Sequence, residues 1–291
     1  MRALIVLLAS VAPTSAAAHA DGAATDGTGW SFALWLTTPL ALSALLWVVG
    51  CIRRARRTHR GQSVLRREGA WFAVAWVVLA LTALSPLHAA GERSFTMHMI
   101  EHEILMLIAA PAFVLARPLP TMLWGLAQPW RGWLGAAVAY TSPLWRTIAA
   151  PVFATIAQAS ALWLWHAPSL FDLALSSDVW HAAQHLSFFI TALIFWAGML
   201  DNRSAIGLRA LCLFATSIVI GALGALMAFS ESPWYAPYSL LGMTPQGLTP
   251  AEDQQFAGLL MWIPGGVVHA GAALALLAPF LRAGETASRA P

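Results

Sequence analysis

The sequence contains no lysine and few charged residues of any kind. It has 291 residues, of which 16 are basic, all of them arginine, and 13 are acidic. Charged residues thus form 10% of the chain, whereas a soluble domain has about 25%. This shortage of charge excludes an ordinary water-soluble globular protein.

Cysteine is equally rare, since Cys51 and Cys212 are the only two. Neither belongs to a Cys-x-x-Cys pair, so the sequence indicates neither a disulfide framework nor a thiolate metal site. We expect both thiols to fill space between packed helices.

Hydrophobic residues, in contrast, make up 59% of the chain, and the mean hydropathy is +0.67. A helix needs about 20 consecutive apolar residues to cross a bilayer. The sequence therefore predicts an all-α, polytopic membrane helix bundle. Its seven predicted transmembrane helices cover residues 30–52, 70–88, 98–115, 147–165, 179–200, 208–229 and 256–281. Proline and glycine interrupt residues 118–143 too often for a span, and we expect this segment to lie at the membrane interface.

The chain begins with a segment typical of a secretory signal peptide. Residues 1–20 contain an arginine, a short apolar run and the small residues Ala18-His19-Ala20, a pattern typical of a cleavage site. We therefore expect four parts: a cleaved or retained signal peptide at 1–20, a short periplasmic N-terminus at 21–29, a seven-helix transmembrane domain at 30–281 and a cytoplasmic tail at 282–291.

The arginines predict how the bundle is oriented. Fourteen of the 16 fall in alternate connecting segments and in the C-terminal tail, with the largest group at 53–67. Because positively charged loops stay in the cytoplasm, we expect the mature N-terminus outside and the C-terminus in the cytoplasm. The same distribution argues against nucleic acid as a partner, since the net charge of +3 then reflects membrane topology.

On this topology, six of the nine histidines gather at the outer ends of spans. Ionisable groups within membrane spans are costly and usually functional. Two His-x3-His pairs are among them, and the two side chains of each pair share one helix face, about 5.4 Å apart along the axis. The six are His88, His98, His102, His166, His181 and His185, and a seventh, His269, lies inside the last span.

The pairs His98/His102 and His181/His185 predict a metal site. Neutral imidazole is the commonest metal ligand in proteins, and two pairs on different helices could hold one ion or two. Imidazole suits copper, zinc or iron, and nearby methionine thioethers favour Cu(I). Glu101 is predicted to neutralise the cation or to orient a ligating imidazole. The predicted metal-site residues are His98, His102, His181, His185, His166, His88, Glu101 and His269.

These residues also have ordinary structural interpretations. A single interfacial histidine can anchor a helix by a hydrogen bond. His269 can bond to a backbone carbonyl that is freed where Pro264 breaks the helix. Asp172 can support a ligand or cap a helix. Glu252 and Asp253 can cap the N-terminus of the last span, where negative charge is favourable.

Four sequence blocks, in this order, carry a resemblance to a known family. They are His98-Met99-Ile100-Glu101-His102 with Ala110-Pro111, Trp163-Leu164-Trp165-His166-Ala167-Pro168, His181 to His185 with Ser187-Phe188-Phe189, and Asp253-Gln254-Gln255 with Gly258 to Gly265. With these blocks the chain resembles the multi-span cytochrome c oxidase assembly factors of the CtaG type. The resemblance implies a bacterial inner-membrane protein that is needed to make active haem–copper oxidase, through the copper of that enzyme.

The residues and the resemblance together lead to a hypothesis of function. We expect a non-enzymatic assembly factor that holds copper at a periplasmic histidine cluster and delivers it to a cytochrome c oxidase subunit. Two alternatives stay open: a membrane haem protein that transfers electrons, with axial histidines from facing helices, and a metal-dependent membrane enzyme. Polar groups are few in the inner halves of the spans, which argues against a copper transporter.

Overall fold

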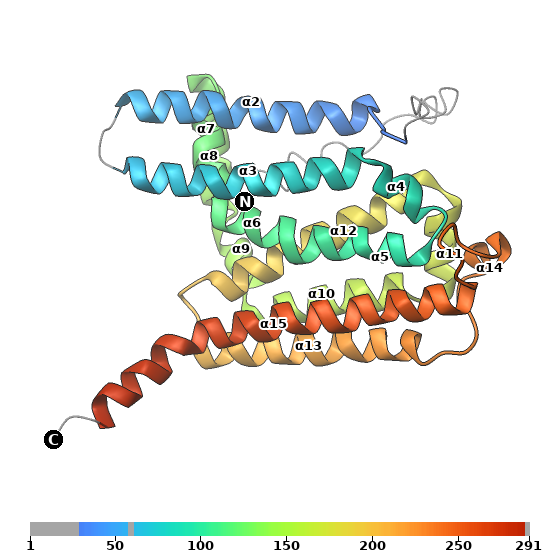
Figure 1. Ribbon diagram of the computed structural model, residues 1–291. Coiled ribbons are helices and arrows are strands. Elements are labelled where there is room, and N and C mark those ends of the chain that lie inside the picture. Colours follow the sequence, from blue (N-terminus) through green and yellow to red (C-terminus); the bar gives the residue numbers. More distant parts are fainter. Residues whose placement is uncertain (1–28, 58–60, 289–291) are drawn as a thin grey trace. The chain divides into compact units, whose positions relative to one another are not determined.

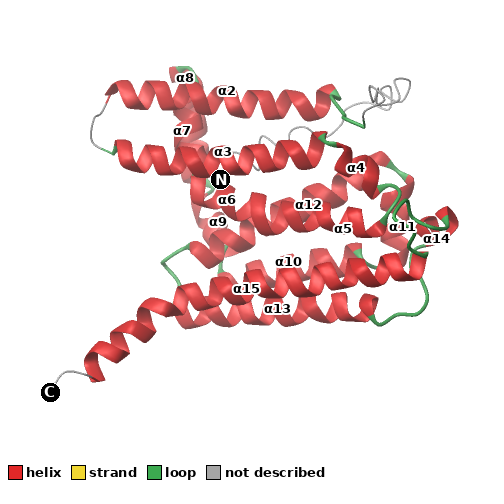
Figure 2. Ribbon diagram, in the orientation of Figure 1, coloured by secondary structure: helices red, strands yellow, loops and turns green. Residues whose placement is uncertain are grey.

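A computed structural model describes residues 29–57 and 61–288 of the chain. Helices joined by short loops and turns make up this described part, and it contains no strand (Figures 1 and 2). The predicted all-α class is therefore confirmed. The predicted signal peptide, and all of the predicted periplasmic N-terminus except Gly29, lie outside the described residues. Two compact units make up the chain: Met1–Glu92 with Ile104–Thr147, and Arg93–Glu103 with Ile148–Pro291.

The first unit contains a pair of long helices and a set of shorter ones. Helices α2 and α3 lie side by side (Figure 1); α2 also packs against α7, and α3 packs against η1 and α6. The stacked rings of Trp47 and Phe72, with centroids 4.2 Å apart, join α2 to α3. The helices of this unit are α2 (Leu34–Arg57), α3 (Gln62–Leu84), α4 (Pro86–Gly91), the π-helix η1 (Ile104–Ala109), α6 (Ala110–Ala116), α7 (Pro118–Gly125), α8 (Gln128–Tyr140) and, up to Thr147, α9 (Ser142–Ile148).

The second unit packs its helices around α12 and α13. Helix α10 contacts both, α11 lies against α12, and α15 lies along α13 and also contacts α5 (Figure 1). Gly224 of α13 and Gly258 of α15 let these two helices approach closely, because a Cβ on either one would overlap the backbone of the other helix. The helices are α5 (Phe95–Glu103), α10 (Pro151–Trp165), α11 (Pro168–Ser176), α12 (Asp178–Leu200), α13 (Ile206–Ala228), α14 (Ala236–Leu241) and α15 (Pro250–Ser288).

Six helical segments of the described chain are long and apolar enough to cross a membrane. A seventh span is reached if the bent pair Ser142–Ile148 and Pro151–Trp165 counts as one. The chain is thus a multi-pass membrane protein, while the count of seven and the orientation stay predictions. The six spans are Leu34–Arg57, Gln62–Leu84, Phe95–Ala116, Asp178–Leu200, Ile206–Ala228 and Pro250–Pro279.

Prolines mark where many of these helices begin. Pro86, Pro118, Pro151 and Pro168 each occupy the first position of a helix, where a missing N–H costs nothing and the fixed φ suits the helix. Pro151 thereby divides the predicted span 147–165, of which only residues from Pro151 onward form α10. Pro264 does not end a helix, since α15 continues through it to Ser288.

A π-helix follows directly after the first histidine pair. The segment Ile104–Ala109 takes this wider turn, and Pro111 lies two residues beyond it. A proline ring inside a helix clashes with the carbonyl four residues earlier, here Leu107, so a wider turn at this point relieves the clash. Single π turns are frequent near functional sites, and hydropathy alone gave no sign of this one.

Helices α2 and α7 touch through backbone atoms. Gly50 of α2 lies against Thr121 of α7 so closely that a Cβ at position 50 would overlap the Thr121 carbonyl. Arg53, one turn further along α2, donates from Nη1 to the carbonyls of Trp124, Gly125 and Leu126 at 2.7–3.1 Å. A cation at the C-terminus of a helix also complements the helix dipole. This contact fixes α7 against α2.

Replacing Gly50 with alanine is expected to separate α2 from α7. Overpacking of this kind costs about 1–3 kcal/mol, so the unfolding midpoint in detergent should fall. The control is Gly69→Ala on α3, where a Cβ meets nothing within 4 Å. Alanine favours helix over glycine by up to about 1 kcal/mol, so the control should leave the midpoint unchanged or raise it. Equal midpoints for the two variants would contradict the close contact.

Candidate metal centre

Four histidines from α5 and α12 converge in the second unit. His98 and His102 lie one turn apart on α5, and His181 and His185 lie one turn apart on α12. The ring centroids of His102 and His185 are 4.6 Å apart, and those of His98 and His181 are 5.2 Å apart and nearly parallel. The two predicted pairs therefore lie next to each other. We call His98, His102, His181 and His185 the histidine cluster.

Three members of the cluster are close enough to share an ion. One ring nitrogen from each of His98, His102 and His185 lies within 4.8 Å of the other two. The Nε2 atoms of His102 and His185 are 3.1 Å apart. Imidazole nitrogens that bind one tetrahedral ion at about 2.0–2.1 Å lie roughly 3.3 Å from each other. The His102 and His185 nitrogens thus have about the separation of two ligands on one small cation, and a His98 nitrogen lies near enough to be a third.

Glu101 lies on the other side of His185. Its Oε1 is 3.6 Å from His185 Nδ1, and the carboxylate is buried, with 3% of the side chain exposed. That distance is too long for a direct hydrogen bond, but the charge favours a hydrogen on Nδ1. A hydrogen on Nδ1 leaves the Nε2 lone pair directed at His102. Of the two roles predicted for Glu101, orientation of an imidazole fits this geometry.

His166 lies at the end of α10, beside the cluster. Its ring centroid is 6.5 Å from that of His102, and its Nδ1 donates to the Leu162 carbonyl at 2.7 Å. Because a carbonyl only accepts, Nδ1 carries the hydrogen and Nε2 keeps its lone pair. Nε2 is buried and has no hydrogen-bond partner in the described part of the chain. Burial lowers the pKa of His166 to about 4, against the opposing effect of the Leu162 carbonyl, so the ring is neutral at neutral pH.

Aromatic side chains close the cluster on two sides. The ring of Phe188 packs on His102 at 4.8 Å, and that of Phe171 packs on His98 at 5.3 Å. Tyr235 stacks on Phe171 at 4.1 Å and donates its hydroxyl hydrogen to the His166 carbonyl at 3.0 Å. Burial is uneven, because His98 and His102 are almost fully buried while 18% of the His185 side chain is exposed. Of these three histidines, the one with an exposed part therefore belongs to α12.

A carboxylate from α15 holds the N-terminus of α5. Asp253 accepts hydrogen bonds from the backbone N–H of Phe95 at 2.6 Å, that of Thr96 at 3.1 Å and the Ser94 hydroxyl at 2.9 Å. The Thr96 hydroxyl in turn donates to the Asp253 carbonyl at 2.9 Å. We expected Asp253 to cap its own helix, whereas its side chain caps α5. The first histidine of the cluster follows three residues after Phe95.

Other polar residues near Asp253 form separate hydrogen bonds. Glu252 caps α15 itself, since it accepts hydrogen bonds from the backbone and hydroxyl of Thr249 at 2.8 Å, as predicted for a capping carboxylate. Gln254 accepts from the backbone N–H of Trp234 at 2.6 Å and so fixes the loop that leads to Tyr235. Asp172 receives a hydrogen bond from the backbone N–H of Ala236, where α14 begins, so its capping role fits better than support of a ligand. Burial raises the pKa of Asp172 against the effect of that hydrogen bond.

Comparison with protein families identifies the family of the chain. The family model described as cytochrome c oxidase caa3 assembly factor matches residues 44–283. The chain belongs to this family. The predicted resemblance is thus confirmed, and it extends over most of the sequence. Comparisons with curated proteins and with solved structures give no match.

Two of the predicted ligands are not members of the histidine cluster. His88 belongs to α4 of the first unit. His269 lies on α15, where its Nδ1 donates to the Gly265 carbonyl at 2.7 Å and its ring stacks on Trp196 with centroids 5.7 Å apart. A bond from His269 to a backbone carbonyl is present as predicted, but it does not go to the carbonyl that we expected to be free. The carbonyl that loses its partner to Pro264 is that of Leu260, so the bond serves a different carbonyl from the freed one.

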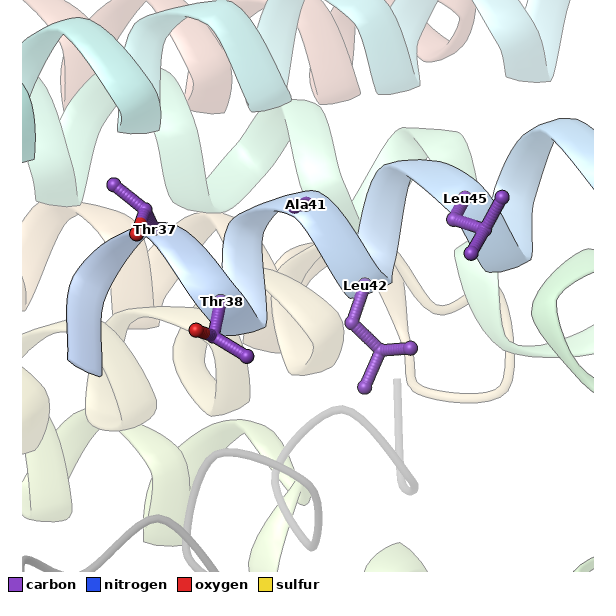
Figure 3. A pocket seen from close by; sticks show the side chains of 5 residues that line it. All are labelled: Thr37, Thr38, Ala41, Leu42 and Leu45. Atoms are coloured by element: carbon purple, nitrogen blue, oxygen red, sulfur yellow. The ribbon is translucent and has the colours of Figure 1, made fainter. Parts of the chain in front are cut away.

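The chain also has a shallow groove on α2. Thr37, Thr38, Ala41, Leu42 and Leu45 line it, all from one helix (Figure 3). Thr37 donates its hydroxyl hydrogen to the Ala33 carbonyl at 3.2 Å, so this hydroxyl is already used within the helix. Among these side chains, none can bind a metal or transfer a proton. The chemistry of the described chain therefore concentrates at the histidine cluster.

Sequence reasoning did not single out two buried residues of the second unit. Gln184 precedes His185, is fully buried, and has no hydrogen-bond partner for its amide in the described part of the chain. The sequence signal for Gln184 was a polar amide side chain inside an otherwise apolar span. Tyr235 is 1% exposed and joins the aromatic wall to His166. Its only signal was an aromatic residue in a loop between two spans, which hydropathy cannot distinguish from an interfacial anchor.

Removal of the Asp253 carboxylate is expected to loosen α5. In Asp253→Ala, the N–H groups of Phe95 and Thr96 lose their acceptor, and hydrogen bonds to a charged group contribute about 1.5–3 kcal/mol each. Hydrogen–deuterium exchange of the first turn of α5 should accelerate, and the unfolding midpoint should fall. The control Glu252→Gln weakens only the cap of α15 and should leave exchange in α5 unchanged. Slow exchange in α5 of the Asp253 variant would show that this carboxylate does not hold the helix.

Proposed function

We propose that this caa3 assembly factor binds copper at the histidine cluster and passes it to a subunit of cytochrome c oxidase. The proposal rests on the distance of 3.1 Å between the His102 and His185 Nε2 atoms. A nitrogen of His98 lies within 4.8 Å of each of them. Assembly of an oxidase that contains copper requires a source of the metal. A centre of three imidazoles, with His181 and His166 beside it, has suitable donors.

The donor set suits a metal that must be released again. Imidazole binds copper well, while thiolate ligands hold it more firmly. Cys51 belongs to the first unit and Cys212 is buried on α13, so neither belongs to the group of donors. The partial exposure of His185 gives a partner protein a side from which to accept the ion. Copper here is cargo, and the role we propose for the protein is not catalytic.

The geometry gives less support to a haem protein. Axial imidazoles lie on opposite sides of a flat macrocycle, so their nitrogens are about 4 Å apart, twice a metal–imidazole bond of about 2 Å. The His102 and His185 nitrogens are 3.1 Å apart, which leaves no room for a macrocycle between them. Of the other ring pairs of the cluster, two belong to one helix each, His98 and His181 are stacked and nearly parallel, and His98 and His185 meet edge to face with centroids 5.6 Å apart.

Copper binding is expected to depend on His102 and His185. The full-length protein, purified in detergent and loaded with copper, should retain the metal through gel filtration, as measured by mass spectrometry of the elements. His102→Ala and His185→Ala should each lose most of it, because two nitrogens hold an ion far less tightly than three. His269→Ala, which removes a buried imidazole bonded to its own helix, should retain it.

Absorption spectra of the same samples test the alternative. Wild-type protein without a Soret band and with bound copper fits the proposal. Wild-type protein that retains no copper after loading would end it, and a Soret band would favour haem. Retention of copper in both cluster variants would place the metal elsewhere in the molecule.

Glu101 is expected to strengthen copper binding without touching the ion. Loss of a carboxylate that orients a ligating imidazole typically lowers metal affinity about 10- to 100-fold. Glu101→Gln should show this loss in competition with a copper chelator. Glu103→Gln is a matched control, since this buried carboxylate lies two residues away on α5 and approaches Gly265 of α15 instead. Equal affinities for the two variants would remove Glu101 from the site.

A further inference from the structure

The first unit carries a concentration of arginine where α2 ends and α7 meets α8. Two of these arginines are used within the protein: Arg53 donates to carbonyls at the end of α7, and Arg54 contacts the Thr121 hydroxyl and pairs with Glu68 at 3.5 Å. Two further guanidinium groups, those of Arg57 and Arg131, approach the ring of Trp124.

Both of these guanidinium groups lie against the same indole. The Cζ atom of Arg131 is 4.3 Å from the centroid of the Trp124 ring, and that of Arg57 is 5.1 Å from it. The Arg57 side chain comes from the exposed end of α2, whereas Arg131 comes from the first turn of α8. Residues 74 positions apart in the sequence thus bring two positive charges to one aromatic surface.

No carboxylate compensates these two charges in the described part of the chain. The ion pairs there involve Arg54, His185 and Arg203, and Arg57 and Arg131 take part in none of them. Two cations on one ring are closer together than about 10 Å, the Debye length at 0.1 M salt, so they repel each other. Cation–π contact offsets part of this repulsion, and an anion between the two groups would offset more.

Helix α8 next to this pair has the composition of a helix at a membrane surface. None of its residues is buried, and Trp130 and Trp133 are 63% and 65% exposed. Tyr140 at its other end is 88% exposed. Tryptophan and tyrosine gather at the level of lipid headgroups, where the ring is apolar and its N–H or O–H meets water.

We propose that Arg57, Arg131 and Trp124 form a binding site for the headgroup of an anionic phospholipid. The planar guanidinium groups donate paired hydrogen bonds to the phosphate oxygens, and Trp124 keeps both groups in place. The exposed rings of Trp130 and Trp133 then cover the glycerol and the upper acyl chains. A soluble phosphate would gain nothing from these exposed aromatic rings, so the arrangement favours a lipid.

The experiment titrates the full-length protein in neutral detergent with short-chain phosphatidylglycerol, short-chain phosphatidylcholine and soluble glycerophosphate, and follows binding by native mass spectrometry. Each arginine at a membrane surface contributes about fivefold, so the wild-type protein should prefer phosphatidylglycerol over phosphatidylcholine by roughly 10- to 30-fold. Glycerophosphate should bind weakly. No preference for phosphatidylglycerol, or equally tight binding of glycerophosphate, would overturn the proposal.

Two double variants separate a built site from general attraction of charge. Arg57→Gln with Arg131→Gln should remove the preference. Arg56→Gln with Arg67→Gln removes the same charge from two exposed arginines and should preserve the preference. Arg57→Lys with Arg131→Lys keeps the charge but loses the planar groups, and should lose most of the preference. If the two glutamine variants show the same lipid preference, or if the lysine variant binds as the wild type does, the lipid is attracted by diffuse charge and the proposal fails.

Discussion

The geometry of the histidine cluster depends on the contact between Asp253 and the first turn of α5. The first N–H groups of a helix have no partner within that helix, and in a membrane each unsatisfied group costs several kcal/mol. Asp253 satisfies those of Phe95 and Thr96 and pins α5 to α15 at the same time. His98 and His102 follow within two turns, so the position of this carboxylate sets where their rings point.

Charge is scarce in this chain, and much of it lies at helix ends. Carboxylates meet helix N-termini: Asp253 at α5, Glu252 at α15 and Asp172 at α14. Arginine meets a C-terminus, with Arg53 bonded to three carbonyls at the end of α7. Each pairing has the sign that the helix dipole favours. With few charges to use, the protein satisfies backbone groups and aligns helices with the same side chains.

Local sequence patterns predicted the helices. They failed for features that depend on contacts between helices far apart in the sequence. The His-x3-His spacing needed only helical geometry, so the pairs on α5 and α12 were predictable, as were the apolar spans. The partner of Asp253 was not, because an acidic residue at the start of α15 fits its own helix equally well. We expected the arginine-rich segment 53–67 to be a loop. Arginine is a good helix former, however, and α2 extends into this segment up to Arg57, while α3 begins within it at Gln62. The wide turn at Ile104 depends on how a proline is accommodated, which hydropathy does not report.

The cap on α5 also has a consequence for biosynthesis. Phe95 and Asp253 are separated by 158 residues, and ribosomes make the chain from the N-terminus onward. While α5 and α12 are already made, the segment that begins at Pro250 has yet to emerge, and the first turn of α5 still lacks its acceptor. The imidazoles can therefore settle into their final arrangement only after the segment that begins at Pro250 has been made. Under the copper-binding function proposed above, the nascent chain therefore lacks a finished site for the metal until that segment emerges.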